Sequence, residues 1–170
     1  RPMSHFDLMI IGTGSGNSIL TEEFDSWNVA IIERAAFGGT CLNAGCIPSK
    51  MLVLPADRMV EAAEATEHLG VTIDPVRADW PAIRDRVFER IDPIAAGGSR
   101  YRHSQPHVTV FEGTARFTGD RTVVVDGTDG STSEVSADRV VLAAGASPRI
   151  PNLPGISEVP FHTSDSIMRI

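Results

Sequence analysis

The sequence predicts an α/β domain with a central parallel sheet and an added antiparallel β-meander. Three short apolar runs have the length and composition of buried strands: 6–11, 29–32 and 139–144. Two helical stretches lie between residues 48 and 98, and shorter apolar runs recur between residues 108 and 125. Strands that alternate with helices favour a doubly wound parallel sheet, and closely spaced strands with turn residues favour a meander.

A glycine turn follows the first apolar run at once: Gly12, Gly14 and Gly16. Glycine lets the backbone approach a pyrophosphate closely, and a short helix expected over 18–24 would direct its free N–H groups at that anion. Glu33 lies 21 residues after Gly12, where a carboxylate can bind ribose hydroxyls and repel a 2′-phosphate. We predict a Rossmann-like dinucleotide site with Asn17 at the usual third glycine; a turn without a ligand is the alternative.

Two helices are predicted in the middle of the chain. The first covers residues 48 to about 69, with a kink at Pro55 and an end at Gly70. The second starts after the capping residue Asp79 and has apolar residues at helical spacing. One proline and two glycines are expected to bend or end it: Pro93, Gly97 and Gly98.

Strands are predicted in the meander at 108–111, 115–117 and 122–125. Asp126–Gly127 and Asp129–Gly130 are typical turn pairs and are expected to separate strands. The meander is therefore expected to lead into the apolar run at 139–144, which is predicted to be a strand of the central sheet.

Composition and charge exclude several classes of protein. The chain has 170 residues and a net charge of -7, with no basic stripe, so nucleic acid is not expected as a partner. No apolar stretch is long enough to span a bilayer, so no membrane association is expected. The N-terminus lacks the zones of a signal peptide, and two cysteines suit redox chemistry, so a cytoplasmic location is predicted.

Cys41 and Cys46 are the strongest candidates for chemistry. In an ideal helix their Cα atoms would be about 8–9 Å apart, beyond the usual disulfide limit of about 6.8 Å. A bridge therefore needs irregular backbone, which Asn43 and Gly45 tolerate, and a proline at position 48 disfavours helix at Ile47. A small strained ring is readily reduced, which suits a catalytic pair. Buried structural cysteines and half of a metal site are the alternatives; no metal is expected, because no histidine lies nearby in sequence.

The segment Gly38–Lys50, GGTCLNAGCIPSK, closely resembles the redox signature of the class I pyridine-nucleotide disulfide oxidoreductases. The segment Val141–Pro148 resembles that family's second flavin segment. Three further segments resemble the mycothione reductase branch of the family: Gly12–Ser18, Arg86–Ala95 and His162–Ile170. The resemblance implies a flavoprotein enzyme, a disulfide oxidoreductase that binds FAD and reduces a small-molecule disulfide.

The resemblance also implies roles for individual residues. Cys46 would form the charge-transfer thiolate against the flavin, and Cys41 would be the interchange thiol that attacks the substrate. Lys50, the only lysine of the chain, would lie near flavin N5. Ser15 and Gly16 would hold pyrophosphate. The full set of expected cofactor-binding residues is Gly12, Gly14, Ser15, Gly16, Glu33, Thr40, Cys41, Lys50, Ala115 and Gly145.

By the same resemblance, residues 1–155 would form the N-terminal part of an FAD-binding domain and residues 156–170 an exit segment. The pyridine-nucleotide domain that would bind NADPH and the interface domain of a homodimer are expected to be absent from this chain. The predicted substrate is mycothione. The alternatives are an NAD-dependent dihydrolipoamide dehydrogenase or, for this chain alone, a flavin-binding module without turnover.

Overall fold

A computed structural model describes residues 3–74 and 77–170 of the chain. Its helices and strands are β1 (Ser4–Ile11), β2 (Val29–Glu33), α1 (Gly39–Asn43), α2 (Cys46–His68), α3 (Trp80–Ser104), β3 (Val108–Gly119), β4 (Thr122–Gly127) and β5 (Thr132–Leu142). Short 3-10 turns cover Ser15–Ile19, Glu22–Phe24, Ile156–Glu158 and Ile167–Arg169.

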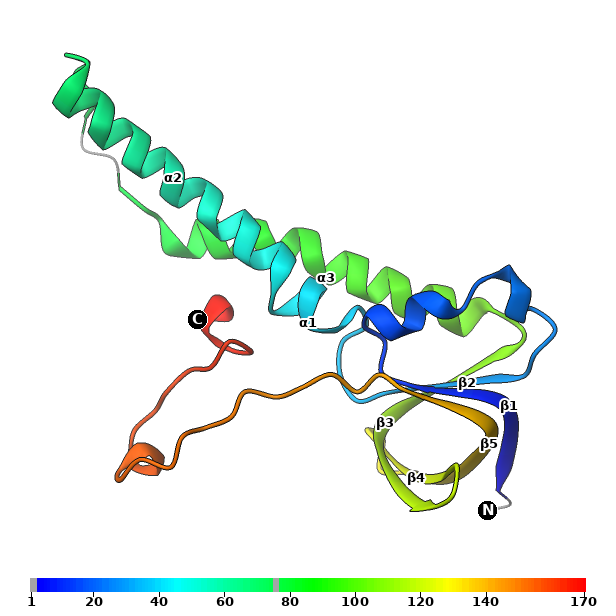
Figure 1. Cartoon of the computed structure of the whole chain (residues 1–170). Coiled ribbons are helices and arrows are strands. Elements are labelled where there is room, and N and C mark those ends of the chain that lie inside the picture. Colours follow the sequence, from blue (N-terminus) through cyan, green and yellow to red (C-terminus); the bar gives the residue numbers. More distant parts are fainter. Residues whose placement is uncertain (1–2, 75–76) are drawn as a thin grey trace. The chain divides into compact units, whose positions relative to one another are not determined.

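The strands β1 to β5 form one closed ring (Figure 1). β1 lies between β2 and β5 and is parallel to both, so that Ile10 is opposite Ile31 on one side and Val141 on the other. β2 is parallel to β3, and β4 is antiparallel to β3 and β5. Residues 108–112 of β3 pair with β2, and residues 113–119 pair with β4. The predicted parallel sheet and antiparallel meander are both confirmed. They share β3 and β5, each of which has one parallel partner and one antiparallel partner.

The central apolar runs are buried because both faces of β1 and β2 are covered. Met9 and Ile11 belong to a cluster that includes residues of β4 and β5, whereas Leu8 and Ile10 belong to a second cluster. Met9, Ile10 and Ile31 are fully buried. Each such side chain contributes about 1.5–3 kcal/mol relative to its exposed state. A slip of one residue would exchange the two faces, so this burial fixes the register.

The described residues divide into two compact units. The first contains the chain up to Thr40 and residues Ile94–Ser147, which hold the strand ring and the glycine turn. The second contains Cys41–Pro93 and Pro148–Ile170, which hold α2 and the beginning of α3. Within the second unit, Arg86 of α3 donates to the carbonyl oxygen of Met51 in α2 at 3.1 Å.

α3 continues to Ser104 through all three residues that were expected to bend or end it. A proline inside a helix costs about 3 kcal/mol and a glycine about 1 kcal/mol relative to alanine. Val87, Ile91 and Ala95 are buried at helical spacing on both sides of Pro93, and this burial offsets the cost. The predicted cap is confirmed, because the backbone N–H of Ala82 donates to Asp79 Oδ1 at 3.1 Å.

The start of α2 differs from its prediction, whereas a predicted turn before β5 is formed. α2 begins at Cys46 and includes Ile47, so the expectation of non-helical backbone at Ile47 is wrong. Pro48 is the third residue of this helix, where the N–H that proline lacks would have no acceptor within the helix.

The turn at Asp129–Gly130 is confirmed, with Gly130 at a φ of 81°. The runs at 108–111 and 115–117 belong to one continuous strand.

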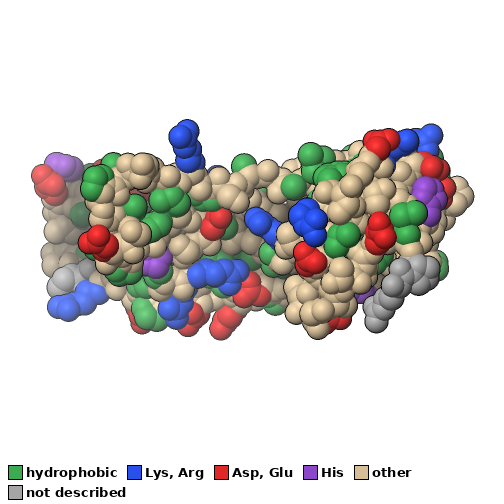
Figure 2. Space-filling view, turned by 90° about the horizontal axis from the view of Figure 1, so that it is seen from below, with side chains coloured by type: hydrophobic (Ala, Val, Ile, Leu, Met, Phe, Trp, Pro, Cys, Tyr) green, Lys and Arg blue, Asp and Glu red, His purple; other side chains and the backbone are tan. Residues whose placement is uncertain are grey.

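Charged side chains of both signs are interspersed with apolar ones on the face drawn in Figure 2. Several large apolar side chains of α2 are exposed: Ile47, Val53, Leu54 and Val60. Across the described ranges, none of the helices combines the length and apolar character needed to cross a membrane.

Candidate cofactor and disulfide sites

The glycine turn starts where β1 ends, between the carboxyl ends of two other strands. The Gly12 N–H donates to the carbonyl of Ile32 in β2 at 2.8 Å, and the Ala143 N–H after β5 donates to the carbonyl of Ile11 at 2.9 Å. Gly12 has a φ of 105°, and a Cβ there would lie 2.3 Å from the Ala143 carbonyl oxygen. Only glycine fits this position.

The other two glycines of the turn also have close neighbours. A Cβ on Gly16 would lie 2.3 Å from Ala143 Cβ. Gly14 meets Gly39, at which a Cβ would lie 2.6 Å from Gly14 Cα. The turn is therefore held against the loop after β5 and against the first residue of α1.

Three successive backbone donors of the turn are unused. No residue within 3–74 or 77–170 accepts a hydrogen bond from the N–H of Gly14, Ser15 or Gly16. Successive free N–H groups form a concave donor surface that suits an anion such as pyrophosphate. The residues present therefore fit the phosphates of a dinucleotide.

The helix expected over 18–24 is not formed. Two 3-10 turns, Ser15–Ile19 and Glu22–Phe24, replace it, and Thr21 between them is extended. Gly16, Asn17 and Ser18 are poor helix formers, which explains why no regular α-helix starts here. The free N–H groups of the turn, rather than the dipole of a long helix, are what remains to bind an anion.

Glu33 lies at the end of β2 and is held in place by Thr13. Its Oε2 accepts hydrogen bonds from the Thr13 N–H at 2.9 Å and the Thr13 hydroxyl at 2.6 Å. Its Oε1 accepts the N–H of Ala35 at 2.9 Å. A carboxylate has about four acceptor positions. Glu33 therefore keeps acceptor capacity for a ribose hydroxyl.

Arg102, near the end of α3, binds the last residue of the turn. Its guanidinium donates to the Asn17 carbonyl at 3.2 Å and to Gln105 Oε1 at 2.7 Å, and only 7% of Arg102 is exposed. Burial lowers the pKa of Arg102, against a smaller opposing effect of Tyr101.

The two cysteines are free and exposed, and their side chains meet. A hydrogen bond with the Cys46 side chain is the largest reason why the pKa of the Cys41 thiol is raised. Desolvation and the charge of Cys46 add to the rise, whereas the Cys46 backbone opposes it. Cys41 lies in α1 and Cys46 is the first residue of α2, so the predicted irregular backbone between them is confirmed. The arrangement is that of a dithiol able to close a disulfide.

The remaining predicted residues lie in different settings. Thr40 in α1 and Lys50 in α2 are exposed, and Lys50 forms no hydrogen bond or ion pair with any described residue. Ala115 lies in the part of β3 beyond its pairing with β2, opposite Val125 of β4. Gly145 follows β5 with a φ of 68° and has open space at its Cβ position.

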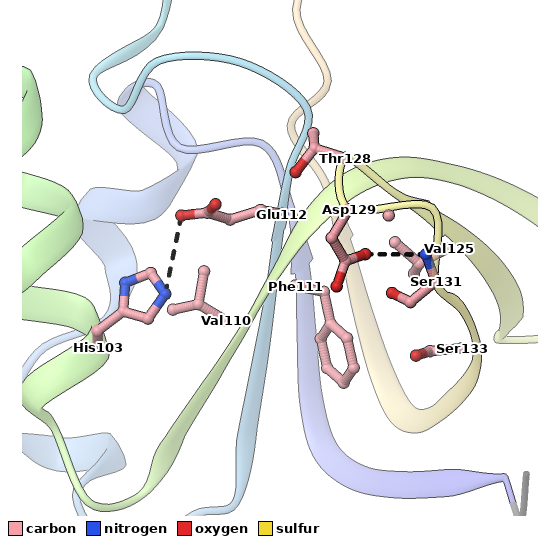
Figure 3. A pocket seen from close by; sticks show the side chains of 10 residues that line it. His103, Val110, Phe111, Glu112, Val125, Thr128, Asp129, Ser131 and Ser133 are labelled. Carbon is pink, nitrogen blue, oxygen red and sulfur yellow. Dashed lines mark hydrogen bonds and ion pairs between the residues drawn. The ribbon is translucent and has the colours of Figure 1, made fainter.

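A pocket of about 280 Å³ lies at the turn between β4 and β5 (Figure 3). His103 faces Glu112 across it, with Nε2 and Oε1 3.8 Å apart. None of the predicted site residues lines this pocket. It adjoins the sheet edge at Glu33, because Glu33 and Glu112 are the last pair in the register of β2 and β3. Among the described His, Cys, Asp and Glu side chains, no group of three or more is arranged to hold a metal ion.

Comparison with known proteins identifies the family. The family described as pyridine nucleotide-disulphide oxidoreductase matches residues 6–169. The chain belongs to this family. It is 44% identical to mycothione reductase of Mycobacterium tuberculosis over 99% of the chain and 37% of that protein. Dihydrolipoyl dehydrogenase of Chlamydia pneumoniae is 33% identical over 91% of the chain and 33% of its own length.

Two solved structures agree with the fold. The chain is similar to the flavoprotein disulfide reductase RclA of Escherichia coli, with a TM-score of 0.72 and 26% identity over 93% of the chain and 32% of RclA. A cysteine variant of RclA has a TM-score of 0.80 at 24% identity, over 99% of the chain and 35% of RclA, which concerns the fold alone. The chain spans about a third of the length of these relatives.

Two residues of the site had no clear sequence signal. Thr13 lies at a position that the glycine motif leaves unspecified, yet it is buried and orients Glu33. Arg102 lies 85 residues from its partner Asn17. The only hint for Thr13 was its place between two glycines next to a strand, and for Arg102 its place at the end of a helix.

Proposed function

We propose that this chain is the FAD-binding, redox-disulfide portion of an NADPH-dependent flavoprotein disulfide reductase. The observation that carries the proposal is the contact between the Cys41 and Cys46 side chains at the start of α2, in a chain of this family. Two thiols that meet across a short irregular turn can exchange electrons as a pair.

The glycine turn and Glu33 are the proposed site of the adenosine pyrophosphate of FAD. The free N–H groups of Gly14, Ser15 and Gly16 would bind its phosphates, and Gly12 lets the turn reach them. Glu33 would accept a hydrogen bond from the ribose. Thr40, Lys50, Ala115 and Gly145 complete the proposed set, on the resemblance of their sequence segments to those of the family.

The two cysteines would have different roles. Cys46 is the first residue of the 23-residue helix α2, and the partial positive charge of a helix N-terminus stabilises nearby negative charge in general. The Cys41 thiol has a raised pKa and keeps its proton more firmly. Attack by Cys41 on a substrate therefore needs a base, and the resemblance to the family implies that a histidine of the interface domain would supply it. These features support Cys46 as the charge-transfer thiolate and Cys41 as the interchange thiol.

The proposed exchange balances in atoms and electrons. The deprotonated Cys41 sulfur attacks the substrate disulfide, and one substrate half leaves and takes up a proton. Cys46 then attacks the Cys41 sulfur, the second half leaves and takes up a proton, and a Cys41–Cys46 disulfide forms. When bound, FAD supplies the carrier through which two electrons from NADPH reach that disulfide. The two cysteines regain their protons and the cycle is complete.

Mycothione is the proposed substrate. The main support is the 44% identity to a mycothione reductase along the chain, against 33% for a dihydrolipoyl dehydrogenase. Two of the segments that resemble the mycothione reductase branch contact each other, since Arg169 pairs with Asp92 at 2.8 Å and lies over the Phe88 ring. The likeness of these two segments to the mycothione reductase branch therefore reflects how they pack against each other. The substrate proposal depends on the identity along the whole chain.

The wider assembly is part of the proposal. Residues 1–155 would form the FAD-binding domain, with 156–170 leading to an NADPH-binding domain and a homodimer interface domain elsewhere in the protein. A cytoplasmic location suits a redox pair that must be reduced in every cycle. The second candidate function is an NAD-dependent dihydrolipoamide dehydrogenase, whose relatives share the cysteine signature.

The test uses the purified full-length protein. Denaturation should release FAD, and the specificity constant kcat/KM for mycothione with NADPH should exceed that for dihydrolipoamide with NAD. A preference for the second pair would replace the substrate and leave the flavin and cysteine roles intact. Residues 1–170 alone should consume no NADPH in sustained turnover, and a protein that stays free of FAD after its addition would contradict the whole proposal.

A further inference from the structure

Arg102 combines three properties that a helix-end arginine does not usually combine. It is almost completely buried, it donates to the backbone of the glycine turn, and it has no acidic partner. No carboxylate of the described ranges forms an ion pair with it. Its neighbours are a carbonyl, an amide oxygen and the Tyr101 ring, whose centroid lies 5.3 Å from the guanidinium.

A buried charge without a partner is costly, because desolvation is not repaid by an opposite charge. The depressed pKa of Arg102 has burial as its largest cause and agrees with this picture. An anion bound close by would supply the missing opposite charge. A buried arginine in this setting therefore favours the anion-bound state of its surroundings.

The free N–H groups of the glycine turn belong to the same turn that Arg102 holds. The Asn17 N–H donates to the Gly14 carbonyl at 3.0 Å, which closes a turn over Gly14–Asn17. The free N–H groups of that turn come from the three residues that directly precede Asn17. Arg102 fixes the carbonyl at the end of the turn and thereby the orientation of the peptide groups before it.

We propose that Arg102 is a positioning residue of the dinucleotide site: it orients the Gly14–Asn17 turn and supplies a buried positive charge that favours a pyrophosphate over an uncharged adenosine. The inference rests on the proposed binding of FAD at the glycine turn. It assigns to a residue of α3 a part of the selectivity that the glycine motif alone would not provide, since free N–H groups carry only partial charges.

The test measures ligand affinity in the full-length apoprotein. FAD is titrated directly, and ADP and adenosine are measured as competitors. Arg102→Gln should weaken FAD and ADP about tenfold, the order expected for loss of one buried charge, and change adenosine less than about twofold. Arg100→Gln is the matched control, because Arg100 is exposed on the same helix and its loss changes the net charge equally. This control should leave all three affinities unchanged.

Arg102→Lys keeps the charge and should restore most of the preference for ADP over adenosine. If Arg102→Gln does not fold, the comparison of Arg102→Lys with the wild type still decides the matter, because Arg102→Lys keeps the charge. Equal weakening of ADP and adenosine by Arg102→Gln, or loss of the preference for ADP in Arg102→Lys, would overturn the inference. Failure of the wild type to bind FAD would instead remove the proposed function itself.

Discussion

The contact between Gly16 and Ala143 allows a size-exchange experiment on the glycine turn. A Cβ on residue 16 would lie 2.3 Å from Ala143 Cβ but 3.7 Å from Ala143 Cα. Gly16→Ala alone must therefore push two methyl groups apart by more than 1 Å, which should lower the free energy of unfolding by about 1–3 kcal/mol. Ala143→Gly alone should lower it by about 0.5–1 kcal/mol, through the flexibility of the unfolded chain.

In the double variant the clashing Cβ is absent, and the next atom is at an ordinary contact distance. The free energy of unfolding of the double variant should therefore be about 1–2 kcal/mol higher than the value expected if the two single effects were additive. Urea-induced unfolding followed by circular dichroism measures all four proteins, with equal m-values required. Gly130→Ala combined with Ala143→Gly is the control, because a Cβ on Gly130 meets no atom within 4 Å. Additivity of the Gly16 and Ala143 effects within about 0.5 kcal/mol would refute the contact.

Three further predictions concern the cofactor and the cysteines. Glu33→Gln should weaken FAD binding about tenfold or more, because a hydrogen bond to a carboxylate is lost. The control Glu134→Gln, at an exposed position, should leave FAD binding unchanged, and flavin fluorescence titration measures both variants. Cys41→Ser should retain a long-wavelength charge-transfer absorbance in the full-length protein and Cys46→Ser should lose it, and identical spectra would contradict the assigned roles. The raised pKa of Cys41 means less thiolate at a given pH, so Cys46→Ala should move the midpoint of Cys41 alkylation to lower pH, as followed by mass spectrometry; a midpoint that stays in place would count against the thiol contact.

The parts of the fold that could be predicted are those in which neighbours in sequence decide the outcome. The run before Gly12 is apolar throughout because both faces of β1 are covered, and that pattern is local. The cysteine signature is likewise contiguous. The continuation of α3 past Pro93 could not be predicted in this way, since it depends on burial of one helix face by distant residues.

The candidate site follows the same division. The glycines and Glu33 were predicted because their spacing reflects one strand–turn–strand unit. Thr13 and Arg102 were not, because their roles arise from contacts across 20 and 85 residues. The expected short helix is replaced by 3-10 turns because the residues around Asn17 have weak helix propensity.

The closed strand ring sets an order for folding during synthesis. β1 acquires its partner β2 within the first 33 residues, but its other edge pairs with β5, which is complete only at Leu142. At about 5–20 residues per second, some 7–26 s of translation separate the end of β1 from the end of β5. Throughout that interval one edge of β1 has no partner within the nascent chain, and such an edge can pair with foreign strands. A ribosome pause before β5 would lengthen this exposure, so codon choice between α2 and β4 should influence the yield of folded protein.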